Sequence, residues 1–203
     1  MCVSASRSFK TKVQLRAQDG NIIHGVNEIK MLGVKLSSDA TFKSHVNDIT
    51  NKMRSRTWAL RDLKQKGMSE RELVQVYTSL IRPLAEYAGA FWHSQLSAEQ
   101  SAWIEAQQTS ALRNIYGAGI SAQKMRARAG INLLSKRRED HCLKFAHACT
   151  SNPRFQHWFE ETKTPKNPRR LNARYCKYQE MPSRTDRHRN APLNYLRRIL
   201  NKN

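Results

Sequence analysis

Positively charged side chains are the most numerous groups in this chain that could do chemistry. The sequence holds 36 Lys and Arg residues against 16 Asp and Glu residues, which gives a net charge of +20. A positive potential of this size attracts phosphate groups, so composition favours nucleic acids or anionic membrane surfaces as partners. Residues 117–203 carry most of the net positive charge, with 20 of the basic residues and only 6 of the acidic ones.

Two basic clusters are candidate contacts for a phosphate backbone. The first surrounds an expected helix and includes Lys52, Arg54, Arg56, Arg61, Lys64 and Lys66, of which we select Lys52, Arg56, Arg61 and Lys64 as candidate nucleic-acid contacts. The second is denser and comprises Lys124, Arg126, Arg128, Lys136, Arg137 and Arg138. A solvated helix face would look like the first cluster, and a nuclear-localisation signal or a simple solubility device would look like the second.

Metal and thiol chemistry find little support in the spacing of the ligands. His141, Cys142, His147 and Cys149 fall on one expected helix, but no Cys-x-x-Cys pair is present. Cys142 and Cys149 lie seven residues apart on the apolar face that Phe145 helps to form, so a buried structural role is favoured over metal binding. We assign no catalytic, cofactor-binding or metal-binding residue. The four cysteines are expected to be reduced thiols.

Short alternating segments in residues 1–40 predict β-strands. VSAS, KVQLRAQ, NIIHGV and IKMLGVKL alternate apolar and polar positions, and Asp19-Gly20 is a hairpin turn signal between two of them. We expect a three- or four-stranded antiparallel patch. The same acid-poor start would also fit a mitochondrial transit peptide, but the alternation fits a strand better.

Helical periodicity begins at Phe42 and continues to about residue 159. A first helix should end at Gly67, with Arg56 at a position where the apolar stripe is interrupted. Ser69 to Glu72 and Ser97 to Gln100 are capping boxes that should open two further helices, the second closed by Gly117. Pro83 removes a backbone donor, so a kink is expected near residues 79–82. A fourth helix should span roughly residues 135–150.

The last residues form a basic tail that contains several prolines. We expect disorder or loose structure over 160–192 and a short helix at 193–200. The fold class is therefore α+β and mainly α, with residual strands at 1–40, a helical domain at 41–117, a basic helical extension at 118–159 and the tail at 160–203. Apolar runs are too short to cross a bilayer and the start has no secretory core, which predicts a soluble intracellular protein of the nucleus or cytoplasm.

Five segments in a fixed order resemble the reverse transcriptases of non-LTR (LINE-type) retrotransposons. They are MLGVKLSSDATFKSHV, YTSLIRPLAEYAGAFW, WIEAQQTSALRNIYG, INLLSKRREDHCLKFAHAC and PSRTDRHRNAPLNYLRRILN. The first three are similar to the end of the palm and the thumb, and the last two to the blocks that close such polyproteins. The resemblance implies a thumb whose Lys and Arg residues hold a template–primer duplex through phosphates. Tyr87 and Trp92, in the second segment, are favoured as core or interface aromatics over base-stacking platforms.

The resemblance also implies what the chain lacks. RNA-directed DNA polymerase chemistry in that family uses an Asp-Asp pair and a further Asp to hold two Mg²⁺ ions. The six aspartates are scattered and no two are adjacent. We therefore expect a truncated reverse-transcriptase-like protein that is no enzyme on its own, holds no cofactor, and binds RNA, DNA or an RNA–DNA hybrid but no membrane. Two alternatives stay open: the C-terminal portion of an active polymerase whose palm and fingers lie upstream, and a decayed retroelement fragment without selected function.

Overall fold

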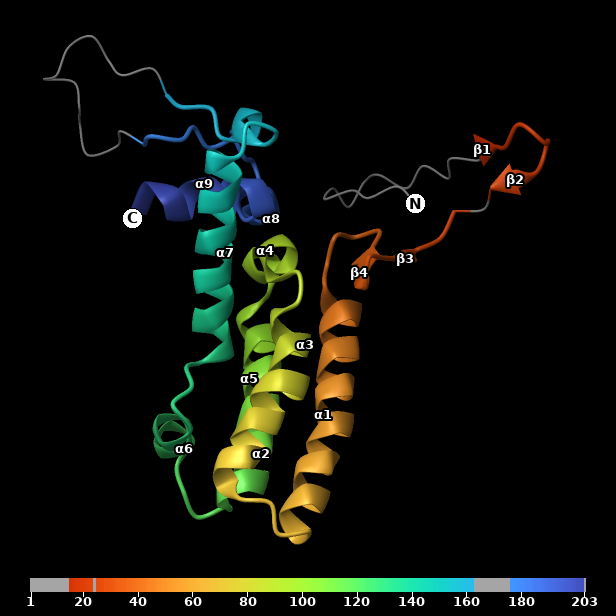
Figure 1. Cartoon of the computed structure of the whole chain (residues 1–203). Coiled ribbons are helices and arrows are strands. Elements are labelled where there is room, and N and C mark those ends of the chain that lie inside the picture. Colours follow the sequence, from red (N-terminus) through yellow and green to blue (C-terminus); the bar gives the residue numbers. More distant parts are fainter. Residues whose placement is uncertain (1–14, 24, 163–175, 203) are drawn as a thin grey trace, which may run out of the picture. The chain divides into compact units, whose positions relative to one another are not determined.

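A computed structural model describes residues 15–23, 25–162 and 176–202. Figure 1 shows a chain built mainly of helices, with short strands confined to its first 40 residues. The chain is α+β and mainly α, as the sequence predicts. It divides into two compact units, the first formed by residues 1–88 and 96–135 and the second by residues 89–95 and 136–203. The strand expected at VSAS and part of the expected tail lie outside the described residues.

The strands form two separate hairpins in the described part of the chain. β1 (Leu15–Arg16) pairs with β2 (Ile22–Ile23) around the turn that Asp19-Gly20 signals. β3 (Glu28–Met31) pairs with β4 (Val34–Ser37). The expected single patch of three or four strands is therefore wrong, because IKMLGVKL turns back on itself at Leu32-Gly33. Both residues have positive φ, 47° and 84°, which is the backbone of a type I′ turn.

The first long helix provides the core of unit 1. α1 runs from Lys43 to Gln65, close to the expected bounds. One face is buried, with Val46, Met53 and Leu60 each 0% exposed, because apolar residues recur at three- and four-residue spacing. This face packs along α5 (Ala98–Tyr116) and against the segment that joins them.

The joining segment bends at Pro83 as expected. α2 (Glu70–Val76) opens on the Ser69 capping box, whose hydroxyl and Glu72 carboxylate satisfy each other's backbone N–H groups. A π-helical turn, η1 (Tyr77–Ile81), then leads into α3 (Arg82–Glu86). Proline has no N–H and its ring clashes with the preceding turn, so the widened turn accommodates it.

The remaining elements of unit 1 follow local capping signals. α5 begins on the Ser97 capping box and ends at Gly117, where φ is 95°. α6 (Ala122–Ala129) lies within the basic helical extension expected at 118–159, although its bounds were not predicted. It begins on Ser121 and ends on Gly130 in the left-handed conformation. It packs against α5 through the buried side chain of Met125.

Unit 2 contains most of α7 (Leu134–Ser151) and the C-terminal helices. The first two residues of α7 belong to unit 1, where the Glu105 carboxylate accepts hydrogen bonds from the N–H groups of Leu134 at 3.2 Å and Ser135 at 2.6 Å. Cys142, Ala146 and Cys149 face an apolar cluster completed by Phe159, Leu196 and Ile199. The structural role expected for these cysteines therefore fits their burial, whereas Phe145, expected on the same face, is 45% exposed.

The described part of the C-terminal segment contains two helices. α8 (Asp186–Arg189) and α9 (Pro192–Lys202) follow the described residues from 176 onward, and α9 covers the short helix expected at 193–200. Arg197 of α9 donates to the carbonyls of Trp158 and Gln179, and Asn194 pairs with the backbone of Met181. Disorder or loose structure was expected over 160–192, and residues 176–185 are largely irregular, with the backbone of Gln179 and Met181 held by polar side chains of α9. Residues 163–175 lie outside the described residues.

Among the helices that the structure describes, none has both the length and the hydrophobicity required to cross a membrane.

Candidate nucleic-acid interface

The two flanks of α1 use their charged residues differently. On one flank, Lys52 lies 2.6 Å from the Asp48 carboxylate, which is also 3.5 Å from Lys35. The hydrogen bond from Lys52 and the two positive charges hold the pKa of Asp48 below its usual value. Asp48 and Lys52 line a cavity of about 320 Å³ together with His45 and Tyr87. Burial lowers the pKa of His45, so it is neutral at physiological pH.

Two further residues expected to contact nucleic acid hold the helices of unit 1 together. Arg56 donates from Nη1 to the carbonyl of Leu80 at 2.6 Å, within the π-helical turn. Lys64 donates from Nζ to the carbonyl of Ile115 at 2.6 Å, in the last turn of α5. Carbonyls at helix ends and in distorted turns lack a regular backbone donor, and a cationic side chain supplies one. Arg56 itself is exposed, and the buried face of α1 runs through Thr57, so Arg56 does not interrupt that face as the sequence predicts.

The other flank of α1 is cationic and open. Arg54 and Arg61 are exposed, and Trp58 between them is 67% exposed. In the part of the chain that the structure describes, the side chains of these three residues take part in no hydrogen bond, ion pair or ring contact. Spacing of three and four residues places them on one stripe of the helix. The stripe, named here the open flank of α1, consists of Lys43, Asn47, Asn51, Arg54, Trp58 and Arg61.

The second basic cluster is divided between elements. On α6, Lys124 is exposed and Arg126 is half-buried. Arg128 is 2.8 Å from the Glu70 carboxylate, and its guanidinium carbon lies 5.2 Å from the centre of the Tyr116 ring. α5 packs against both α1 and α6. Lys136, Arg137 and Arg138 belong to unit 2, so the six residues of this cluster are divided between the two units.

Arg138 was predicted to contact nucleic acid, and this prediction is wrong because the side chain is buried. It is 0% exposed, with its guanidinium carbon 5.5 Å from the centre of the Trp92 ring and its Nε 3.4 Å from Nδ1 of His93. A side chain in this position cannot reach a phosphate on the surface, because α4 (Gly89–Trp92) covers it. Burial and, to a lesser extent, the charge of Arg138 together lower the pKa of His93 to about 4. Lys136 is exposed and lies 3.3 Å from both Glu139 and Asp140.

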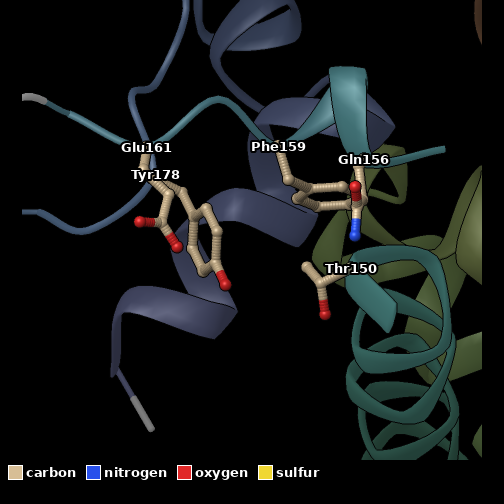
Figure 2. A pocket seen from close by; sticks show the side chains of 5 residues that line it. All are labelled: Thr150, Gln156, Phe159, Glu161 and Tyr178. Atoms are coloured by element: carbon tan, nitrogen blue, oxygen red, sulfur yellow. The ribbon is translucent and has the colours of Figure 1, made fainter. Parts of the chain in front are cut away.

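A separate cavity lies in unit 2. It has a volume of about 260 Å³ and is lined by Thr150, Gln156, Phe159, Glu161 and Tyr178 (Figure 2). The Phe159 and Tyr178 rings meet edge to face at 6.0 Å, and Glu161 lies 3.2 Å from Lys177. Within the described ranges, no group of three or more His, Cys, Asp or Glu residues could hold a metal ion.

Of the six residues of the open flank, the sequence prediction selected Arg61 alone. Arg54 was counted in the first basic cluster without being selected, and Trp58 was not singled out. Helical spacing could have found both, since they lie off the buried stripe of Val46, Met53 and Leu60. Charge density alone directed attention to Lys52, Arg56 and Lys64, which are exposed yet committed to contacts within the protein. A count of charges cannot distinguish a cation that is free to bind a phosphate from one that is held by a contact within the protein.

Comparison of the chain with protein-family models, curated proteins and solved structures finds no match.

Proposed function

We propose that this chain is a nucleic-acid-binding protein of the non-LTR reverse-transcriptase type, which holds duplex or structured RNA through contacts to phosphates. The open flank of α1 carries the proposal. Three exposed cationic side chains, those of Lys43, Arg54 and Arg61, lie on one helical stripe with two amides and no carboxylate. Phosphate contacts require such free donors, since a cation already paired within the protein must first give up its partner.

The charge of the whole chain supports the same proposal. A net charge of +20 in 203 residues gives a long-range attraction for any polyanion. Contacts of this kind carry no sequence information, so binding should depend on the shape and charge of the nucleic acid rather than on its bases. RNA, DNA and an RNA–DNA hybrid are all expected to bind.

The test is a salt titration of binding to labelled RNA duplexes, measured by fluorescence anisotropy. The dissociation constant should be micromolar or tighter at ~50 mM salt, and log K should fall linearly with the logarithm of salt concentration with a slope of roughly −3 to −5. Two duplexes of unrelated sequence and equal length serve as matched ligands, and their affinities should agree within about twofold. An affinity that does not change between ~50 and ~200 mM salt would contradict the proposal.

A further inference from the structure

Trp58 lies between Arg54 and Arg61 on the open flank of α1 and is the most exposed tryptophan of the chain. Its side chain is 67% exposed, compared with 37% for Trp158 and 0% for Trp92, and Trp103 is half-buried. A tryptophan that faces water forgoes the burial of a large apolar surface. The exposed ring is therefore a candidate contact for a ligand that covers it.

The core of unit 1 does not need this ring. Val46, Met53 and Leu60 fill the opposite face of α1 and are each 0% exposed. Trp58 is the one exposed large apolar side chain of α1, a helix that the structure describes throughout. Asn47 and Asn51 continue the stripe on one side and Arg61 on the other. A protein partner would need a wider apolar patch than a single ring among amides and cations.

The neighbours of Trp58 are the groups that bind a nucleic-acid strand. Arg54 precedes it by four residues and Arg61 follows it by three, so both lie on its face of the helix, about 10 Å apart along the axis. Their long side chains can reach phosphates on either side of a base that covers the ring between them. Aromatic rings flanked by cations are the elements from which single-strand binding surfaces are built.

We infer that Trp58 is a stacking platform for an unpaired nucleobase, with Arg54 and Arg61 holding the phosphates on either side of it. The ligand class is single-stranded RNA or DNA, or an unpaired segment next to a duplex. A base inside a duplex is stacked on its neighbours and offers no free face to the ring, so the platform discriminates in favour of unpaired nucleotides. This inference rests on the proposed function and narrows its ligand.

The experiment compares an unstructured RNA of about 15 nucleotides with an RNA duplex of equal length, using the full chain and the variants Trp58→Ala and Trp58→Phe. Trp58→Ala should weaken binding to the single strand roughly 5- to 100-fold, which is the effect of losing one stacked base. Binding to the duplex and the slope of log K against log salt should stay unchanged, because no charge is removed. Trp58→Phe keeps an aromatic face and should retain most of the affinity.

Tryptophan fluorescence gives an independent signal. The single strand should quench the emission of the unsubstituted protein, and Trp58→Phe should bind while losing that quenching. Phe145→Ala is the matched control, since Phe145 is 45% exposed on another helix, between Lys144 and Ala146. It should leave binding to both ligands unchanged. Circular dichroism should show the same melting curve for all three variants, as expected for exposed positions.

The possible outcomes separate this inference from the proposed function. A protein that binds neither RNA overturns both. If both RNAs bind and Trp58→Ala binds the single strand as tightly as the unsubstituted chain, only the stacking platform is overturned. Equal losses on the single strand and the duplex also overturn the platform, because they would show a contact that does not depend on an unpaired base.

Discussion

Arginine occurs beside tryptophan in both units, and the two settings are opposite in burial. In unit 1, Trp58 is 67% exposed on a stripe with the exposed Arg54 and Arg61. In unit 2, Trp92 and Arg138 are both 0% exposed, with the guanidinium carbon 5.5 Å from the ring centre. The guanidinium of Arg138 is in cation–π contact with the buried Trp92 ring, whereas in α1, which the structure describes throughout, Arg54 and Arg61 make no contact with the Trp58 ring. The buried arginine therefore belongs to the core, and the exposed arginines are available to a ligand.

Helical register explains the difference. Trp58 lies opposite the apolar stripe of α1, so its ring and its neighbours face water. Arg138 lies four residues before Cys142 and eight before Ala146, so it continues the buried stripe of α7 and meets Trp92 of α4. Arg138 thus belongs to the core of unit 2, where its removal would leave a cavity and an uncovered ring.

Substitution of Arg138 should produce the largest effect. Arg138→Ala is expected to lower the free energy of unfolding of unit 2 by about 3 kcal/mol, because a buried cation loses its place against Trp92 and His93 without a replacement. Arg138→Lys keeps the charge but not the planar group that stacks on Trp92. Its free energy of unfolding should therefore lie between those of the unsubstituted chain and Arg138→Ala. Urea denaturation followed by circular dichroism measures the change. Arg54→Ala is the control, and its free energy of unfolding should differ from that of the unsubstituted chain by no more than about 0.5 kcal/mol. Equal losses of stability in Arg138→Ala and Arg54→Ala would contradict the assignment of Arg138 to the core and of Arg54 to the surface.

Acidification should weaken the same buried cluster. The pKa of His93 is lowered to about 4 in the fold, so between roughly pH 4 and 6.5 the unfolded chain binds a proton that the folded chain excludes. Stability from this group is complete above pH 6.5 and falls as the pH drops through that window. Protonation would also place a proton on Nδ1, where the Nε of Arg138 donates at 3.4 Å.

The measurement is urea unfolding at pH 7 and at pH 4.5. The unsubstituted chain should lose on the order of 2 kcal/mol that His93→Gln does not lose, since glutamine has no charge to gain. Tyr195, whose ring centre lies 5.9 Å from that of His93, does not titrate in this range because burial raises its pKa to about 12. Identical pH profiles for the two proteins would rule out His93 as the source of the acid sensitivity.

Local chemistry in the sequence predicted the helix starts and stops well. Ser69 and Ser97 begin helices because a hydroxyl and a nearby Glu or Gln satisfy N–H groups within one turn. Pro83 predicted the distorted turn η1 for a similarly local reason. The turn at Leu32-Gly33 was missed, since it requires a leucine with positive φ, an uncommon choice.

Tertiary contacts account for the rest of what the sequence did not predict. The partners of Arg138 lie 45 or more residues away along the chain, so nothing near it signals burial. Arg56 and Lys64 likewise reach carbonyls 24 and 51 residues away. The C-terminal segment is held by Asn194 and Arg197, whose contacts to backbone cannot be read from a basic, proline-containing composition. Of the candidate contacts in α1, only Arg61 lies on the open flank.

The smallest expected effect on stability belongs to the open flank, and it gives the sharpest test of the comparison. Arg54→Gln combined with Arg61→Gln removes two exposed charges, so the free energy of unfolding should change by no more than about 0.5 kcal/mol. Binding to an RNA duplex should nevertheless respond. Removing one cation that touches a phosphate makes the slope of log K against log salt less steep by roughly 1, so the double variant should flatten the slope by about 2.

Lys52→Gln combined with Lys66→Gln provides the charge-matched control on α1 and its C-cap residue. These lysines lie 2.6 Å from Asp48 and 2.8 Å from Asp62, so their charges are already compensated within the protein. Both double variants lower the net charge by two. If Arg54 and Arg61 contact phosphates directly, their variant will flatten the salt dependence more than the lysine variant does. If the two double variants flatten the salt dependence equally, RNA binding depends only on the total charge of the chain. The open flank of α1 would then be exposed, unlike the cluster at Arg138, but it would not be a binding site for RNA.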